Sequence, residues 1–151
     1  MKRSSRLSLA LHALVHLHKQ SDTPMTSATL AQCLMTNAVV VRRVLGELRE
    51  AKLVTSAKGH DGGWRLLRPA AEISLHAVYA AMGENLLIRT ESDPGDVQCG
   101  IVRSVNAVMG EFIADAEALL ADRLQRISLD DIARQASPHP LFPPSGVHHH
   151  D

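Results

Sequence analysis

Three glycines at positions 59, 62 and 63 lie between two short β patterns and restrict the fold more than any other part of the chain. Leu53–Ala57 has the alternation of a half-buried strand, and Trp64–Leu67 has that of a second one. Pro69 then ends the second strand, because proline cannot donate to a strand ladder. The segment therefore predicts a β-hairpin with glycines at its turn.

Three helical patterns precede this hairpin. Apolar residues three or four apart predict a helix over about 7–19, and Thr26 or Ser27 can cap a second helix that runs to Leu34. Asn37 can cap a third helix almost immediately afterwards. Two helices joined by three or four residues and followed by a two-stranded wing are typical of a winged helix-turn-helix. The apolar face expected for the third helix comprises Val40, Val41, Val44, Leu45 and Leu48.

The chain after the hairpin is also predicted to be mainly helical. Ser74 can cap a helix that Gly83 terminates, and a long helix is expected over about 101–126. Ser128 and Asp131 have the spacing of a capping box, which opens a last short helix to Gln135. We therefore expect a mainly α fold with a small β-hairpin: a winged helix-turn-helix followed by a long helix.

Charge is divided unevenly along the chain. The 151 residues carry 16 Lys plus Arg and 16 Asp plus Glu, so the formal net charge is zero. Residues 1–70 hold 11 basic and 4 acidic side chains, whereas residues 71–151 hold 5 and 12, so the halves carry +7 and −7. This asymmetry indicates that the amino-terminal half has an anionic partner and that the other half does not.

The predicted third helix carries the groups that base edges and phosphates require. Arg42 or Arg43 could hold guanine O6 and N7 with two parallel donors, and Val39 or Ala38 could contact a thymine methyl. Taken alone, the two arginines would indicate only a solvated helix face. Together with the wing and the basic half, they favour double-stranded DNA as the partner. The candidate base-reading residues are Thr36, Asn37, Ala38, Val39, Arg42 and Arg43.

The tip of the predicted hairpin is a second candidate contact surface. Its glycines let the backbone approach sugar and phosphate closely, and a narrow minor groove attracts a cation such as Lys58. A tight turn with incidental charge is the alternative. Trp64 is interpreted as a packing residue between wing and body rather than as a base-stacking group. The candidate residues of the wing are Lys58, Gly59, His60, Gly62, Gly63 and Arg65.

The predicted long helix has an apolar stripe. Its members are spaced alternately three and four residues apart, which is the spacing of a helix that pairs with another helix. The core helix of a monomer could have the same stripe, so the pattern leaves both alternatives open. The candidate dimerisation residues are Val102, Val105, Met109, Phe112, Ala116 and Leu119.

The two cysteines form no CxxC motif, which argues against a disulfide framework or a zinc finger and favours the reducing cytoplasm. Cys33 is interpreted as a core residue. Cys99 directly precedes the long helix, where backbone amides can lower a thiol pKa, whereas Asp93 and Asp96 oppose this effect. An inert thiol is therefore favoured for Cys99, and a thiol sensor is the alternative. No apolar run reaches the length of a membrane span, so no membrane partner is expected.

Five short segments form a more specific pattern. They are Met1-Lys2-x-Ser4-x-Arg6, Asn37–Leu45, Leu53-Val54-x-Ser56, Gly59-x-x-Gly62-Gly63-Trp64-x-Leu66, and Arg68-Pro69-Ala70 ahead of Ile73-Ser74-Leu75. This pattern resembles the Rrf family of bacterial transcription regulators, whose members include IscR, NsrR and CymR. The resemblance extends from the amino terminus to about Gln135.

The resemblance implies a homodimer, joined mainly by the long helix, that binds a pseudo-palindromic operator and most often represses transcription. It assigns base reading to five positions of the third helix and minor-groove contact to Lys58 and its neighbours. It also raises the question of an iron–sulfur cluster, which several relatives hold with three closely spaced cysteines. Here the corresponding loop has only Cys99, and no histidine lies between His76 and His139, so no cluster and no other cofactor are expected.

The sequence therefore predicts a homodimeric DNA-binding transcriptional regulator of the cluster-less type, a repressor in the cytoplasm, with an unknown effector. The alternative is a winged-helix protein-interaction module that no longer binds DNA. An enzyme is not expected, because neither cysteine has an evident histidine partner and no phosphate loop or metal quartet is present. The expected organisation is a DNA-binding domain over 1–83, a loop over 84–100, a dimerisation helix and short terminal helix over 101–135, and a flexible tail over 136–151.

Overall fold

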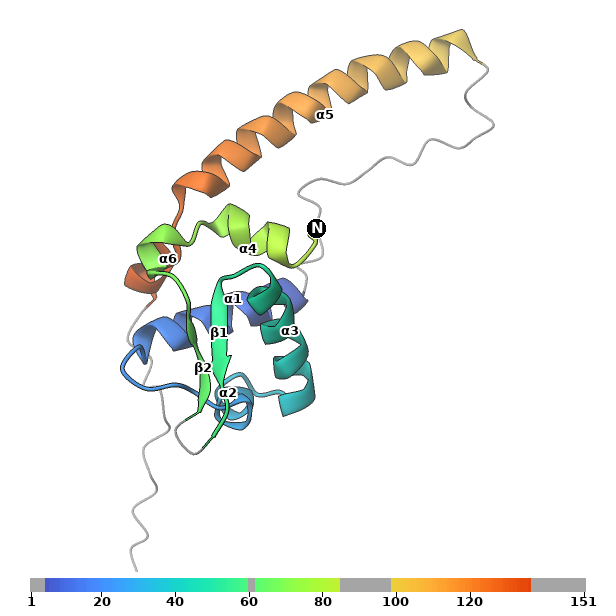
Figure 1. Ribbon diagram of the computed structural model, residues 1–151. Coiled ribbons are helices and arrows are strands. Elements are labelled where there is room, and N and C mark those ends of the chain that lie inside the picture. Colours follow the sequence, from blue (N-terminus) through green and yellow to red (C-terminus); the bar gives the residue numbers. More distant parts are fainter. Residues whose placement is uncertain (1–4, 60–61, 85–98, 137–151) are drawn as a thin grey trace, which may run out of the picture.

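Helices surround one small hairpin in the computed structural model, which describes residues 5–59, 62–84 and 99–136 (Figure 1). The predicted mainly α fold with a β-hairpin is confirmed. In chain order, the described elements are α1 (Ser5–Lys19), α2 (Ser27–Cys33), α3 (Ala38–Glu50), β1 (Val54–Ala57), β2 (Gly63–Leu66), the short 3-10 helix η1 (Ala70–Glu72), α4 (Leu75–Ala81), α5 (Gly100–Arg126) and α6 (Leu129–Gln135).

Side-chain caps set the starts of the two helices that form the helix-turn-helix. The hydroxyl oxygen of Thr26 accepts a hydrogen bond from the amide of Thr29 at 3.1 Å and begins α2. The side-chain oxygen of Asn37 accepts one from the amide of Val40 at 3.0 Å and begins α3. Each cap satisfies an amide that has no partner inside its helix. The expected caps are confirmed, with Thr26 rather than Ser27 at α2, which ends at Cys33.

The hairpin is antiparallel and packs onto the body through both strands, β1 against α3 and β2 against α1. Its pairing runs from Val54 opposite Leu66 to Ala57 opposite Gly63. β1 begins one residue later than predicted, because the amide of Leu53 donates to the carbonyl of Leu48 in the last turn of α3 instead of entering the ladder. β2 begins and ends one residue earlier than predicted. A side chain at Gly63 would place its Cβ 2.8 Å from the carbonyl oxygen of Met25, so this close approach requires glycine.

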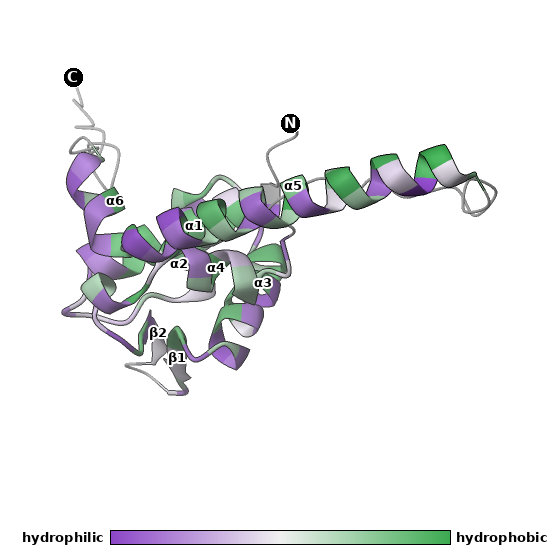
Figure 2. Ribbon diagram, turned by 90° about the horizontal axis from the view of Figure 1, so that it is seen from above, coloured by the Kyte–Doolittle hydropathy of each residue, from purple (hydrophilic) through white to green (hydrophobic). Residues whose placement is uncertain are grey.

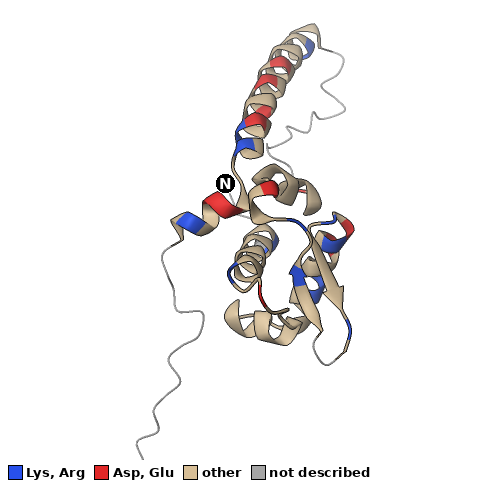
Figure 3. Ribbon diagram, turned by 60° about the vertical axis from the view of Figure 1, so that its left-hand side comes forward, with Lys and Arg blue, Asp and Glu red and all other residues tan. Residues whose placement is uncertain are grey.

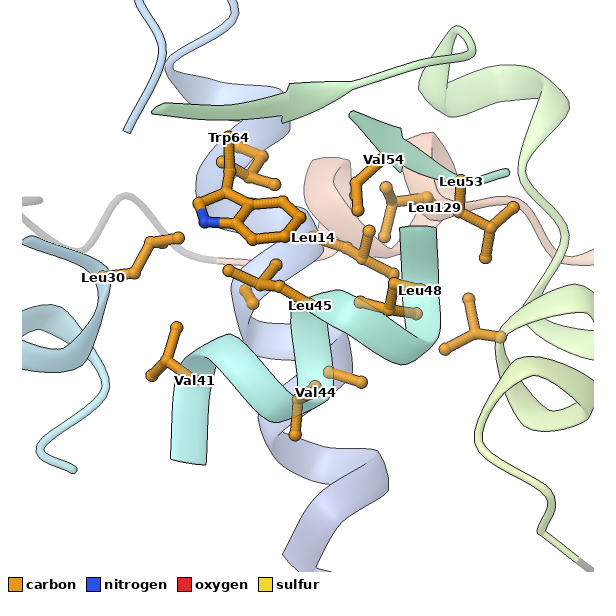
Figure 4. Close-up of a cluster of buried hydrophobic side chains, with 14 of the residues drawn as sticks. Leu14, Leu30, Val41, Val44, Leu45, Leu48, Leu53, Val54, Trp64 and Leu129 are labelled. Atoms are coloured by element: carbon orange, nitrogen blue, oxygen red, sulfur yellow. The ribbon is translucent and has the colours of Figure 1, made fainter. Parts of the chain in front are cut away.

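The core lies between α1, α2, α3 and the hairpin (Figure 4). On α3 the buried residues are Val41, Val44, Leu45 and Leu48, at the spacing of one helix face. Val40 was expected on this face, but it is exposed, because it lies about a quarter turn from the centre of the buried stripe. The same cluster takes in Leu14 of α1, Leu30 of α2, Leu53 and Val54 at the start of the hairpin, and Trp64 of β2.

The short helix α6 returns to this body. It packs on α1 and η1, and Leu129 is fully buried in the common core. Two backbone hydrogen bonds fix its start: the amide of Leu129 donates to Ile73, and the amide of Leu75 donates to Ile127, both at 2.8 Å. The expected capping box is present, since Ser128 and Asp131 bond reciprocally to each other's amides.

The long helix α5 extends away from the body, with its carboxy-terminal end next to α6 (Figures 1 and 2). It contacts α4, and Leu124 in its last turns is buried. Residues 85–98 and 137–151 lie outside the described residues, and they include most of the predicted loop over 84–100 and of the predicted tail over 136–151. Within the described parts of the chain, no helix has the length and apolarity needed to cross a membrane.

Candidate nucleic-acid interface

The outer face of α3 presents the residues that the sequence nominated for base reading. Because Val41, Val44 and Leu45 face the core, the intervening Arg42 and Arg43 are exposed. Val39 is 59% exposed in the first turn. Asn37 is exposed and its side-chain oxygen is used by the cap. Two nominated residues are less open: Thr36 is half-buried, and Ala38 is half-buried and packs against the core.

The wing places a cation beside a close turn of backbone. Lys58 and Gly59 are exposed before the tip, and Arg65 is exposed on β2. The amide of Gly62 donates to the carbonyl of Gly59 at 3.0 Å, and a Cβ at Gly62 would lie 2.3 Å from the carbonyl oxygen of Ala57. Glycine at position 62 is therefore a steric requirement of the tip. The nominated His60 lies outside the described residues.

A set of contacts missed by sequence reasoning joins α3 to the wing. Nη1 of Arg49 donates to the hydroxyl oxygen of Ser56 on β1 at 3.2 Å. The Arg49 guanidinium carbon lies 5.4 Å from the centre of the Trp64 ring, within the range of a cation–π contact. Nε1 of Trp64 in turn donates to the hydroxyl of Ser27 on α2 at 3.0 Å. Trp64 is 9% exposed, so its interpretation as a packing residue is confirmed.

Met35 is a second residue that sequence reasoning missed. It lies between α2 and α3 with a φ of 55° and an exposure of 94%. Non-glycine residues with positive φ are uncommon, and a large apolar side chain in water has no packing role in the protomer. Met35 therefore adds an exposed apolar group just ahead of the first turn of α3, where Val39 is also exposed. The sequence pattern assigns residue 35 to the turn between two helices and gives no sign that its side chain is exposed.

One of the two acidic side chains of α3 is paired with a neighbouring cation. Glu47, which is half-buried on α3, forms an ion pair with Arg6 of α1. Figure 3 shows Lys and Arg on the hairpin and the adjacent helices, and on α5 it shows Asp and Glu with Arg near both ends. The cations of the wing therefore lie away from α5, which carries side chains of both signs.

The apolar stripe of α5 is largely exposed. Of the residues nominated for dimerisation, Phe112, Leu119, Val105 and Met109 are 69%, 64%, 54% and 44% exposed. Val102 and Ala116 are half-buried. Ile101 and Val108 extend the exposed stripe and were not nominated. An apolar face of this size on a projecting helix indicates an interaction surface rather than the core of a monomer.

The two cysteines lie in different environments. Cys33 is half-buried in α2 and packs against the core. Cys99 is exposed and is the N-cap residue of α5. Hydrogen bonds from the backbone amides of Val102 and Ile101 lower the pKa of the Cys99 thiol. Asp93 and Asp96, which were expected to oppose this, lie outside the described residues, and the role of Cys99 as a sensor stays a prediction.

Known proteins share the sequence pattern and the fold of this chain. Residues 3–135 match the Rrf2 family, which is described as an iron-dependent transcriptional regulator. This chain belongs to the Rrf2 family. YwnA of Bacillus subtilis is 28% identical over 129 residues, which cover 85% of this chain and 95% of YwnA. The expected family resemblance is therefore confirmed, and an Rrf2 protein is a DNA-binding transcriptional regulator rather than an enzyme.

Solved structures of Rrf2-like proteins share the fold. The structure of T. potens IscR has a TM-score of 0.68 at 20% identity and covers 91% of this chain and 89% of its own. The structure of CymR from B. subtilis has a TM-score of 0.63 at 19% identity and covers 91% and 99%. The winged helix-turn-helix followed by a long helix is therefore the architecture of this family.

The Rrf2 description raises the question of whether this chain could hold iron. An iron–sulfur cluster is ordinarily held by about four protein ligands, mainly cysteine thiolates. The whole sequence has two cysteines, and they lie in α2 and at the start of α5. Within the described residues, no group of three or more His, Cys, Asp or Glu side chains converges as a metal site would require. The donor set of a single protomer therefore does not fit a cluster of this kind.

Proposed function

We propose that this Rrf2 protein is a homodimeric repressor that binds a pseudo-palindromic operator and uses no iron–sulfur cluster. Recognition helix 37–50 lies in the major groove, and wing 58–65 lies in the adjacent minor groove. Two protomers related by a two-fold axis then bind two half-sites. This arrangement is the ordinary docking geometry of a dimeric helix-turn-helix protein.

The observation that carries this proposal is the outward face of α3. Arg42 and Arg43 are exposed beside Val39, while the opposite face of the same helix is buried. Planar guanidinium groups match the paired acceptors of guanine, and the apolar side chain matches a thymine methyl. Lys58 and Arg65 supply cations on the wing, where phosphates or a narrow minor groove would attract them.

The stripe on α5 supports the dimer. Its exposed residues span five turns of the helix, with Ile101 and Leu119 at the two ends. Pairing of two such helices would bury these residues at the spacing of a helix–helix seam. The acidic side chains along α5 would then be held away from the DNA phosphates (Figure 3).

The absence of a cluster is supported by the donor set alone, since two cysteines in separate helices cannot supply three neighbouring thiolates. The low cysteine content also favours a reducing cytoplasm as the place of action.

The test is a fluorescence-anisotropy titration with a duplex from the region upstream of the protein's own gene. If the dimer neutralises six to ten phosphates, its affinity should fall roughly a thousandfold or more between about 50 and 200 mM salt. Changing Arg42 and Arg43 together to Ala should abolish specific binding. The matched control is Arg126→Ala on α5, which removes an exposed arginine far along the chain and should bind as the wild type does.

Two results would contradict the proposal. Wild-type protein that binds no duplex at low salt would favour a protein-interaction module, and unchanged affinity of the double variant would exclude α3 as the reading helix. Repression itself is tested with a reporter gene behind the same duplex, whose transcription should rise in cells that carry the Arg42 and Arg43 variant.

A further inference from the structure

The guanidinium of Arg49 lies where three DNA-facing elements meet. It comes from the last turn of α3, donates to Ser56 on β1 at 3.2 Å and lies 5.4 Å from the centre of the Trp64 ring on β2. Trp64 then donates to Ser27 in the first turn of α2 at 3.0 Å. A continuous series of contacts therefore joins α2, the wing and α3.

The wing needs such support because it is small. Each of its strands has four residues, and a two-stranded hairpin by itself is marginally stable in water. The base of the hairpin is attached to the body on both strands, through the buried Val54 at the start of β1 and through the backbone pairing of Trp64 on β2 with Met25. On β1, residues Thr55 to Ala57 are half-buried or exposed, and the Ser56 hydroxyl is the group that Arg49 holds.

If α3 and the wing contact two grooves at the same time, the DNA affinity depends on the angle between them. A wing that must be ordered when DNA binds lowers affinity, because its conformational freedom is lost at that moment. A wing already fixed against α3 avoids this cost.

We propose that Arg49 is a positioning residue that fixes the wing against the recognition helix, through Ser56 and Trp64, so that both reach the duplex together. The inference rests on the proposed function and deepens it. Lysine would replace it only in part, because its ammonium keeps the charge but lacks the planar group that both stacks on Trp64 and donates sideways to Ser56.

The first test compares binding of wild type, Arg49→Met, Arg49→Lys, Lys58→Ala and the Arg49→Met/Lys58→Ala double variant to the upstream duplex at constant salt. Arg49→Met should lower affinity about five- to tenfold, and Arg49→Lys should recover part of the loss. The double variant should bind no more weakly than the weaker single variant, because a misplaced wing has already lost the Lys58 contact. Losses that multiply would instead make Arg49 an independent phosphate contact and overturn the proposal.

The second test needs no DNA, so it separates this inference from the proposed function. Amide hydrogen exchange of β1 and β2 should be faster in Arg49→Met than in wild type, with α1 unchanged. If Arg49→Met folds poorly, Ser56→Ala takes its place. This variant removes a single hydroxyl and should speed the exchange of β1 and β2 in the same way but to a smaller extent. Arg126→Met is the control for loss of an arginine. Unchanged exchange in the wing would contradict the proposal, and faster exchange throughout the chain would show that Arg49 stabilises the whole fold instead.

Discussion

At the scale of single residues, the proposed reading surface contains exposed apolar side chains as well as the two arginines. Met35 and Val39 together place apolar surface in water at the start of α3, and nothing in the described chain covers Met35. Such exposure lowers the solubility of a lone protomer unless a partner covers it. In a major groove, the matching apolar group is the C5 methyl of thymine.

We therefore expect thymine methyl groups to contribute to binding through these two residues. Replacing the thymines of one half-site by uracil removes only methyl groups and should weaken wild-type binding about three- to tenfold. A Met35→Gln/Val39→Ser variant should bind the two duplexes equally. Equal binding of both duplexes by the wild type would show that these side chains do not read thymine.

His16 on α1 links pH to stability. Burial lowers its pKa below the ordinary value of 6.5, with further lowering by His12 and Lys19, and its Nδ1 has no hydrogen-bond partner within the described residues. The folded protein therefore binds this proton less readily than the unfolded chain. The stabilising effect of a neutral His16 is present above about pH 6.5 and is lost as the pH falls toward the lowered pKa.

The melting temperature of the wild type should accordingly fall between about pH 7.5 and about pH 5.5. His16→Gln removes this titration, so its melting temperature should fall less over the same interval. His18, which lies 3.3 Å from Asp130 of α6, is unchanged in both proteins, so the difference between them reports His16 together with its interaction with His12. Parallel curves for the two proteins would contradict the assignment.

At the scale of elements, local chemistry was predictable and tertiary contacts were not. Each of the caps at Asn37, Ser74 and Ser128 depends on a side-chain oxygen three residues before the amide that it accepts from, so the sequence alone located them. The docking of α6 on α1 depends on Leu129 reaching a core built from distant segments. Hydrophobic periodicity describes one segment at a time, so it could predict neither the docking of α6 on α1 nor the contact between Arg49 and Trp64.

The element that most needs a partner is α5, and this gives a prediction for assembly. Phe112→Glu places two carboxylates near the two-fold axis of the proposed helix pair, so the dimer dissociation constant should rise about a hundredfold or more. Phe112 is 69% exposed in the protomer, so the melting temperature of the body should change little. Sedimentation equilibrium measures the first quantity.

The matched control for this variant is Glu117→Gln, an exposed residue outside the apolar stripe that should dimerise as the wild type does. A Phe112→Glu protein that remains fully dimeric would show that another surface joins the protomers.

At the scale of the whole molecule, the candidate DNA contacts and the candidate dimer contacts lie on different parts of the fold. The wing and α3, with their exposed cations, belong to the body, and α5, which has an exposed apolar stripe and charges of both signs, projects from it (Figures 2 and 3). Composition predicted the excess of positive charge in the amino-terminal half, but the two halves of the sequence are not separate parts of the molecule, because α4 and α6 pack on α1. The direction in which α5 projects depends on α4 and α6 and was not readable from the sequence.

The central claim is that two copies of one unit place a helix in the major groove and a wing in the minor groove. Dimethyl sulfate protection tests it directly, since guanine N7 reports the major groove and adenine N3 the minor groove. We predict protection of both atoms in two symmetric half-sites, with centres about one helical turn, or a multiple of it, apart. Protection in one groove only, or in a single unpaired site, would contradict the account.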